Sequence, residues 1–409
     1  MKVWLAKGAV MTLAFSTGLV AAQSILADFF PAPITPSGQG FYEPDKLLGW
    51  KLIPNKQKGR TPLVGKIVLD EKINSVGFRD TKHTYSKGQD VFRIVILGDS
   101  FCDFLDLPLK QLFHSVLERK LNSELHQPIE RINLGISGFG TAQEYLALKH
   151  YGLKYRPDLV ILAFYLGNDV HDNSLEWQGR DMDVTHTTTP FFVLKDGTLE
   201  PKPPNPNPGE APTNIESKAP LQRIKDFANK DFPDVVYRIR NVPLLAKFLL
   251  ELGLIEAEPN LPRTLDPGTE LYLEQYPPEV AEAWEVTKAL ILKLAEELEA
   301  SKIGFLVVVI PLEFEFRVDE LKKVLEYAEM RTLKIDPRKP EGILSKFLET
   351  NHINFLLLHP GFEKYNNETG KSLHFHRPGD NHWNADGHAL AAQLIYQKLV
   401  DDKLVPLKR

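Results

Sequence analysis

The chain has 409 residues, of which 43% are hydrophobic, so it can bury one large core or two modest ones. Its formal net charge is −5, and no segment is dense in Lys and Arg, so nucleic acid is not expected as a partner. Cys102 is the only cysteine, which excludes an intramolecular disulfide and a thiolate metal cluster.

The N-terminus has the features of an export signal. Lys2 and Lys7 precede an uncharged run from Gly8 to Ala27, which ends in small residues that a signal peptidase accepts. We interpret residues 1–28 as a signal peptide or a membrane anchor, because about twenty uncharged residues approach the length that spans a bilayer. A buried N-terminal helix is the alternative. The expected location is the periplasm or the outside of the cell, with membrane association through this segment if it is retained.

Residues 29–90 are predicted to be a linker and an N-terminal extension. Pro31, Pro33 and Pro36 prevent a regular helix at its start. The most distinctive sequence motifs that follow are Gly49-Trp50 and the segment Asn74–Asp80. We expect this part to precede the main domain, which is assigned to residues 91–409.

The main domain alternates predicted strands with predicted helices. The strands are short apolar runs, and the helices show apolar residues at helical spacing. The predicted strands are 92–97, 131–134, 158–164, 305–310 and 353–358, and the predicted helices are 109–124, 142–151, 278–300 and 386–400. This alternation predicts an α/β fold, a parallel sheet with helices on both faces. Ligands then bind at the carboxyl ends of the strands.

An insertion interrupts this alternation at about residues 186–275. Six prolines between Pro201 and Pro212 favour an extended, solvated connection. The second half, from Pro220 to Leu254, carries an amphipathic run, which predicts either a small helical cap or a solvent-exposed spacer.

Polar residues follow three of the strands. Gly98-Asp99-Ser100 follows the first, the glycine-rich loop from Asn133 to Thr141 follows the second, and Gly167-Asn168-Asp169 follows the third. A fourth group, Asp380-Asn381-His382-Trp383, precedes the last helix. Each of these motifs, taken alone, also occurs in ordinary turns and helix caps. Together they offer a serine, an imidazole to take its proton and a carboxylate to orient that imidazole.

These four motifs, in this order, resemble the conserved blocks of the SGNH/GDSL hydrolase superfamily. The resemblance extends from about Phe92 to the C-terminus, apart from the insertion. The resemblance implies a three-layer, flavodoxin-like parallel sheet. It also implies that Ser100 is the nucleophile, that His382 is the general base, and that Asp380 is the orienting carboxylate. The oxyanion hole would be formed by the N–H groups of Ser100 and Gly138 and the side-chain amide of Asn168.

Two departures from the family pattern concern the pocket. The acid lies two residues before the histidine instead of three, and the Asp-x-His-Trp form is similar to that of alginate O-acetylation proteins. After Ser100 the chain carries Cys102, Asp103, Phe104 and Asp106 where a glycine is common. The wall of the pocket is therefore expected to be unusual.

Several other polar residues are given structural interpretations. Cys102 is interpreted as a small buried thiol, and Asp99 and Asp169 as acceptors for backbone amides. His171 either lines the cleft or faces water. His374 and His376 could bind a metal with Asp380, but no further ligand is suitably spaced. No cofactor is implied.

Three functions remain open. The first is a serine-dependent ester hydrolase acting on an O-acylated small molecule or glycan. The second is an O-acetyltransferase that modifies an exopolysaccharide or cell-wall glycan. The third is a non-catalytic glycan-binding protein with the same fold. The sequence indicates neither the acyl group nor the oligomeric state.

Overall fold

Five parallel strands form the central sheet of the computed structural model, which describes residues 41–57, 73–125, 127–178, 189–202, 267–330, 334–375 and 381–406. The strands are β3 (Phe92–Gly98), β4 (Ile129–Asn133), β5 (Leu159–Tyr165), β8 (Gly304–Ile310) and β9 (Phe355–Leu357). Their order is β4-β3-β5-β8-β9, with parallel pairing throughout. In chain order this is the 2-1-3-4-5 arrangement of a flavodoxin-like sheet, so the predicted fold class is confirmed.

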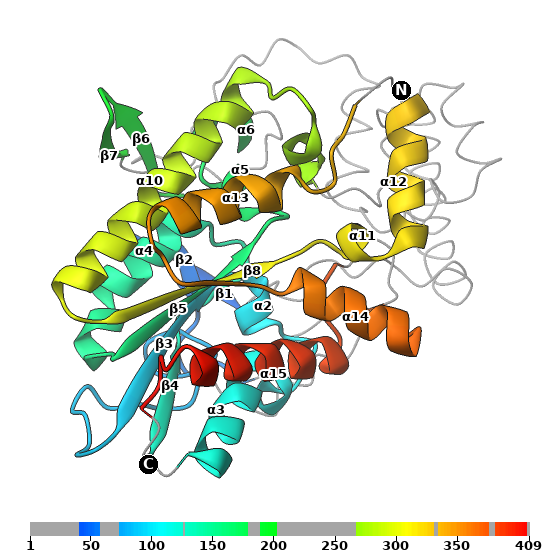
Figure 1. The fold of residues 1–409 in the computed structure, drawn as a ribbon. Coiled ribbons are helices and arrows are strands. Elements are labelled where there is room, and N and C mark those ends of the chain that lie inside the picture. Colours follow the sequence, from blue (N-terminus) through cyan, green and yellow to red (C-terminus); the bar gives the residue numbers. More distant parts are fainter. Residues whose placement is uncertain are drawn as a thin grey trace, which may run out of the picture. The chain divides into compact units, whose positions relative to one another are not determined.

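Helices cover both faces of this sheet (Figure 1). On one face lie α4 (Thr141–His150), α10 (Pro278–Ala300) and α13 (Lys339–Thr350), and on the other lie α3 (Phe113–Glu124) and α15 (Ala385–Asp401). The two sets enclose one main apolar core, in which every residue of β5 is buried. A central parallel strand is covered on both faces, which is why the sequence of β5 is continuously apolar.

Shorter helices connect these elements. They comprise α2 (Ser100–Asp103), α5 (Asp169–Asp172), α6 (Leu175–Gln178), α11 (Glu313–Phe316) and three 3-10 helices at Leu109–Gln111, Gly152–Tyr155 and Pro267–Tyr272. The predicted start of the helix at Leu109 was wrong. Leu112 is extended, with φ −67° and ψ 144°, so a 3-10 turn precedes α3, which begins at Phe113.

Three longer helices were not predicted: α12 (Val318–Met330), α13 and α14 (His359–Thr369). Pro340 and Pro360 lie in the first turns of α13 and α14, where the missing N–H of proline costs nothing. Gly370 ends α14 in the left-handed conformation at φ 66°. These start and stop signals were present in the sequence.

The described start of the expected insertion is a hairpin. Strand β6 (Phe191–Lys195) pairs with the antiparallel strand β7 (Thr198–Lys202) through a two-residue turn. Asp196 and Gly197 both have positive φ, 51° and 77°, as a type I′ turn requires. Pro201 therefore lies in a strand and not in an irregular connection, and Phe191 and Phe192 are buried. The predicted helical cap at 220–254 and the segment 1–28 lie outside the described residues.

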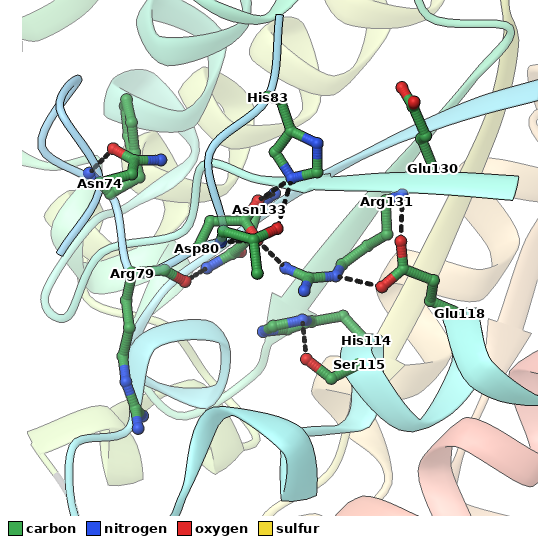
Figure 2. Close-up of polar contacts among 12 residues, drawn as sticks. Asn74, Arg79, Asp80, His83, His114, Ser115, Glu118, Glu130, Arg131 and Asn133 are labelled. Carbon is green, nitrogen blue, oxygen red and sulfur yellow. Dashed lines mark hydrogen bonds and ion pairs between the residues drawn. The ribbon is translucent and has the colours of Figure 1, made fainter. Parts of the chain in front are cut away.

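The N-terminal extension packs onto the sheet domain at two places. A hairpin of β1 (Tyr42–Asp45) and β2 (Gly49–Leu52) buries Phe41, Leu48 and Leu52. The second place is Asp80, whose carboxylate contacts Arg131 of β4 and accepts a hydrogen bond from the N–H of Asn133 at 2.7 Å (Figure 2). No helix within the described ranges is long and apolar enough to cross a membrane.

Candidate active site

Ser100 lies at the carboxyl end of β3, where the strand turns into the short helix α2. Asp99 caps this helix, because its side chain accepts a hydrogen bond from the N–H of Phe101 at 3.0 Å. The turn is half-buried at Ser100 and fully buried on either side of it. The hydroxyl is therefore presented at the edge of the sheet where ligands bind in such folds.

His382 approaches Ser100 from near the C-terminus. Its Nε2 lies 2.7 Å from the Ser100 Oγ, across 282 residues of sequence. The imidazole stacks on the ring of Phe104 at a centroid distance of 4.5 Å and an interplanar angle of 21°, and it also contacts Phe101 at 5.4 Å. The structure thus brings the predicted nucleophile and the predicted base within hydrogen-bonding distance, and it packs the imidazole against two aromatic rings.

The backbone next to His382 is held by pairing and by a helix cap. The His382 carbonyl accepts a hydrogen bond from the N–H of Phe375 at 3.0 Å. Asn384 caps α15 by accepting from the N–H groups of Asp386 and Gly387 at 2.9 and 3.0 Å. Asp380, the predicted orienting carboxylate, lies outside the described residues, and its role stays a prediction.

The two predicted oxyanion donors outside α2 follow β4 and β5. Gly138 is exposed, with φ +78°, in a turn closed by a hydrogen bond from the Phe139 N–H to the Ile136 carbonyl at 3.0 Å. Asn168 is the N-cap residue of α5 and is half-buried. Both loops are at the carboxyl edge that also presents Ser100, and the roles of Gly138 and Asn168 as oxyanion donors stay predictions.

Close packing behind Ser100 explains two glycines and the cysteine. A Cβ at Gly98 would lie 2.6 Å from the Cys102 sulfur, and a Cβ at Gly135 would lie 2.2 Å from the Cys102 Cβ. Cys102 is fully buried, and burial raises the pKa of its thiol well above the ordinary value. The interpretation of Cys102 as a small buried thiol is confirmed.

Buried carboxyl groups lie beneath the site. Burial raises the pKa of Asp99 to about 7, although the Phe101 N–H, His382 and the Asn168 side chain favour its ionised form. Burial, followed by the nearby carboxylates, also raises the pKa of Glu144 and Asp169 well above their ordinary values. Asp169 accepts from the Tyr165 N–H at 2.7 Å, so Asp99 and Asp169 do hold backbone amides as predicted.

Asp103 is a residue of the site region that the sequence pattern did not single out as functional. It is fully buried three residues after Ser100, and it accepts hydrogen bonds from the hydroxyls of Ser137 and Tyr42, the latter at 3.3 Å. Burial raises the pKa of Asp103 to about 6, although these hydrogen bonds favour the ionised carboxylate. The departure from the family pattern after Ser100 was the only signal of this contact in the sequence.

One cluster of potential metal ligands occurs among the described residues. Ligand atoms of Glu315, Glu341 and His359 lie within 4.8 Å of one another. The guanidinium of Arg338 contacts the His359 Nδ1 and lies 3.2 Å from the Glu341 carboxylate. Because this cation already balances the cluster, we assign no metal to it.

The remaining histidines near the site are packed into the fold. His171 is 7% exposed, and its Nδ1 lies 2.9 Å from Asp172, so it does not face water. His374 is buried and lies 3.7 Å from Glu313. The other members of the weak metal pattern, His376 and Asp380, lie outside the described residues.

Comparisons with known proteins find similar structures at low sequence identity. No family model and no curated protein matches the sequence. The chain is similar to the crystal structure of TesA, with 10% identity over 76% of this chain and 99% of that chain and a TM-score of 0.36. It is similar to a GDSL-like lipase from Bacteroides thetaiotaomicron, with 12% identity over 76% and 88% and a TM-score of 0.32. It is also similar to a catalytic mutant of the acetylxylan esterase Axe2 from Geobacillus stearothermophilus, with 11% identity over 75% and 94% and a TM-score of 0.36.

Proposed function

We propose that this protein is a serine-dependent ester hydrolase that acts through an acyl-serine intermediate on an O-acylated carbohydrate outside the cytoplasm. The observation that carries the proposal is the 2.7 Å contact between the Ser100 Oγ and the His382 Nε2. A serine hydroxyl becomes an effective nucleophile when a neighbouring imidazole removes its proton. The uncharged run from Gly8 to Ala27 supports the location.

The proposed reaction has two stages. The Ser100 hydroxyl donates its proton to the His382 Nε2 as its oxygen attacks the acyl carbon. The N–H groups of Ser100 and Gly138 and the Asn168 amide donate hydrogen bonds to the resulting oxyanion. His382 then returns the proton to the departing alkoxide. In the second stage, His382 takes a proton from water, which attacks the acyl carbon. His382 then donates this proton to the Ser100 Oγ as the acyl–oxygen bond breaks, which releases the carboxylic acid and restores the serine hydroxyl.

The O-acetyltransferase alternative differs only in the second stage, where a sugar hydroxyl replaces water. Its sequence signals were the export signal and the Asp-x-His-Trp form, of which the structure describes Trp383 but not Asp380. Trp383 is 1% exposed and packs against Phe101 and Phe362, with centroid distances of 4.6 and 5.2 Å. Core packing accounts for a tryptophan at this position without any role in acyl transfer. Hydrolysis is therefore the function we favour.

The test of the proposal uses the full chain, an aryl acetate and a fluorophosphonate label. We expect hydrolysis and a single label on the peptide that contains Ser100. Ser100→Ala and His382→Ala should each lower kcat by roughly 1,000-fold or more. Ser123→Ala, an exposed serine on α3, is the matched control and should retain full activity.

Three outcomes would change the assignment. A label on another residue would remove Ser100 as the nucleophile. Acetylated oligosaccharide formed faster than free acetate in the presence of an acceptor sugar would replace hydrolysis with acyl transfer. Absence of both labelling and turnover, with oligosaccharide binding retained in Ser100→Ala, would support the non-catalytic glycan-binding protein.

A further inference from the structure

The turn that carries Gly138 is a type II turn formed by Ile136, Ser137, Gly138 and Phe139. Its closing hydrogen bond joins the Phe139 N–H to the Ile136 carbonyl at 3.0 Å, and Gly138 has φ +78°. Types I and II differ mainly in the orientation of the central peptide, which is the Ser137–Gly138 unit. Glycine tolerates both orientations. The turn alone therefore does not determine where the Gly138 N–H points.

Trp50 of the N-terminal hairpin contacts this peptide directly. Its indole N–H donates to the Ser137 carbonyl at 3.1 Å across 87 residues of sequence. The same ring lies 3.3 Å from the position of a Cβ at Gly138, and it meets Phe139 edge-on at a centroid distance of 5.7 Å. The indole thus contacts three consecutive residues of the turn.

Peptide geometry converts this contact into an orientation of the Gly138 N–H. The Ser137 carbonyl and the Gly138 N–H belong to one planar trans peptide unit, so they point in opposite directions. An indole that holds the carbonyl on one side fixes the N–H toward the other side. A flip of the peptide would break the bond from Trp50.

Contacts through Asp103 also join the turn to the helix of the nucleophile. The Ser137 hydroxyl donates to the Asp103 carboxylate, and the Tyr42 hydroxyl of the same hairpin donates to its other oxygen at 3.3 Å. Gln143, at the start of α4, donates to the Leu48 carbonyl at 2.7 Å. The hairpin is therefore bonded to the turn, to α2 and to α4.

We propose that Trp50 is a positioning residue that fixes the Gly138 N–H toward the oxyanion by holding the Ser137 carbonyl. The inference rests on the proposed function, because Gly138 matters in this way only if Ser100 forms a tetrahedral intermediate. It makes the N-terminal hairpin a working part of the active site, although the hairpin precedes the first strand of the sheet domain.

Trp50→Phe tests the proposal, because it keeps an aromatic ring and removes the N–H donor. We expect kcat for an aryl acetate to fall roughly 10- to 100-fold with little change in KM, since one misdirected oxyanion donor acts on the transition state. Affinity for a trifluoromethyl ketone, which adds to the serine and loads the oxyanion site, should fall by a similar factor. A merely structural role would lower the melting temperature without this parallel loss.

Two variants are matched controls. Trp284→Phe removes a buried indole from α10. Lys51→Ala alters the residue next to Trp50; the Lys51 ammonium lies 3.8 Å from the Glu43 carboxylate and 3.4 Å from that of Asp45. Both should retain the wild-type affinity for the ketone. Wild-type kcat in a folded Trp50→Phe, or equal losses in the controls, would overturn the proposal.

A crystal structure of the wild-type ketone adduct tests the same point if Trp50→Phe does not fold. The adduct oxygen should lie within hydrogen-bonding distance of the Gly138 nitrogen while the indole still contacts the Ser137 carbonyl. A flipped peptide or a displaced indole would refute the role of Trp50. Failure of the wild-type protein to label at Ser100 would instead refute the proposed function, so the two failures are distinguishable.

Discussion

The imidazole of His382 is oriented by aromatic packing as well as by hydrogen bonding. Phe104 stacks on one face of the ring, and Phe101 touches it from the helix that begins with Ser100. Phe104 in turn contacts Phe375, at a centroid distance of 5.5 Å. The segment after Ser100 therefore supplies the rings that hold the His382 imidazole, so these two side chains are positioned by the same few residues.

Glu315 provides a residue-scale prediction about pH. It is 6% exposed, and burial raises the pKa of its carboxyl to about 8. Its Oε1 accepts from the Leu312 N–H and the Tyr272 hydroxyl at 2.9 and 2.7 Å. The ordinary pKa of a Glu carboxyl is 4.5, so between pH 4.5 and about pH 8 the folded protein keeps a proton on Glu315 that the unfolded chain releases. The contribution of Glu315 to stability therefore decreases as pH rises through this window.

Glu315→Gln is uncharged at every pH and keeps an acceptor oxygen. We expect it to be roughly 2 to 5 kcal/mol more stable than wild type at pH 9 and close to wild type at pH 5, at about 1.4 kcal/mol per pKa unit. Urea denaturation at the two pH values measures this difference. Glu368→Gln, on the exposed face of α14, is the control. An equal response to pH in Glu315→Gln and wild type would contradict the expectation.

Part of the site could be predicted from the sequence because its residues are tied to strand ends. Ser100 and Asn168 each follow a strand whose apolar run is visible, whereas Gly138 follows the more polar strand β4. Parallel strands bring their carboxyl ends to one edge. Asp103 and Trp50 could not be predicted, because their contacts join segments that only the tertiary fold brings together. Trp50 was noticed as a distinctive residue, but nothing in the pattern pointed to the Ser137 carbonyl.

At the scale of elements, α3 and α15 are joined by a side chain that replaces a helix cap. The Phe113 N–H begins α3 and donates to the His388 Nδ1 of α15 at 3.2 Å. Leu112, the N-cap residue of α3, offers no side-chain cap. His388 is fully buried, and burial lowers its pKa to about 3, so it is neutral and accepts this bond.

His388→Ala should destabilise the protein by roughly 2 to 4 kcal/mol at pH 7, because it leaves a buried N–H without a partner and opens a cavity. The folded pKa of His388 lies below its ordinary value of 6.5, so the unfolded wild type gains a proton as pH falls and the folded protein does not. The loss in His388→Ala should therefore shrink between pH 7 and pH 4.

Chemical denaturation at both pH values checks this prediction. Gln393→Ala, exposed on the same helix, serves as the control and should change stability by less than about 0.5 kcal/mol. A loss in His388→Ala no larger than in Gln393→Ala would show that α3 does not depend on this bond.

The elements that could be predicted are those with uninterrupted patterns. The apolar runs of β3, β5 and β8 and the long helix α10 were located closely, because burial on both faces or along one helical face dictates their composition. The β6–β7 hairpin was missed because the prolines from Pro201 to Pro212 favoured an extended connection, although Asp196-Gly197 is a hairpin turn signal. Tertiary pairing decided the structure there.

At the scale of the whole molecule, a buried ion pair attaches the N-terminal extension to the sheet. The side chain of Asp80 is fully buried between Arg131, the Asn133 N–H and His83, whose Nε2 lies at 3.2 Å. Burial alone would raise the pKa of Asp80, but Arg131 and these hydrogen bonds hold it below its ordinary value of 3.8. The attachment therefore stabilises the fold above that pH and weakens as the carboxylate is protonated.

Asp80→Asn should cost about 3 kcal/mol in folding stability at pH 7. Among the residues that the structure describes, it leaves the buried Arg131 only the partly exposed Glu118, at 3.6 Å, as a carboxylate partner. Urea denaturation measures the loss. Asp90→Asn, which removes an exposed carboxylate from the same segment, is the control. A loss below about 1 kcal/mol would mean that the extension is held to the sheet by its apolar contacts instead.

The separation of 282 residues between Ser100 and His382 has a consequence for the newly made chain. Protein synthesis runs from the N-terminus, so the serine and the first three sheet strands emerge long before the imidazole. A ribosome-bound or truncated product that stops short of residue 382 contains Ser100, the proposed nucleophile, without His382, its proposed base. If Ser100 and His382 act as proposed, hydrolytic competence would arise only after synthesis has passed residue 382, and fragments released earlier would be inactive.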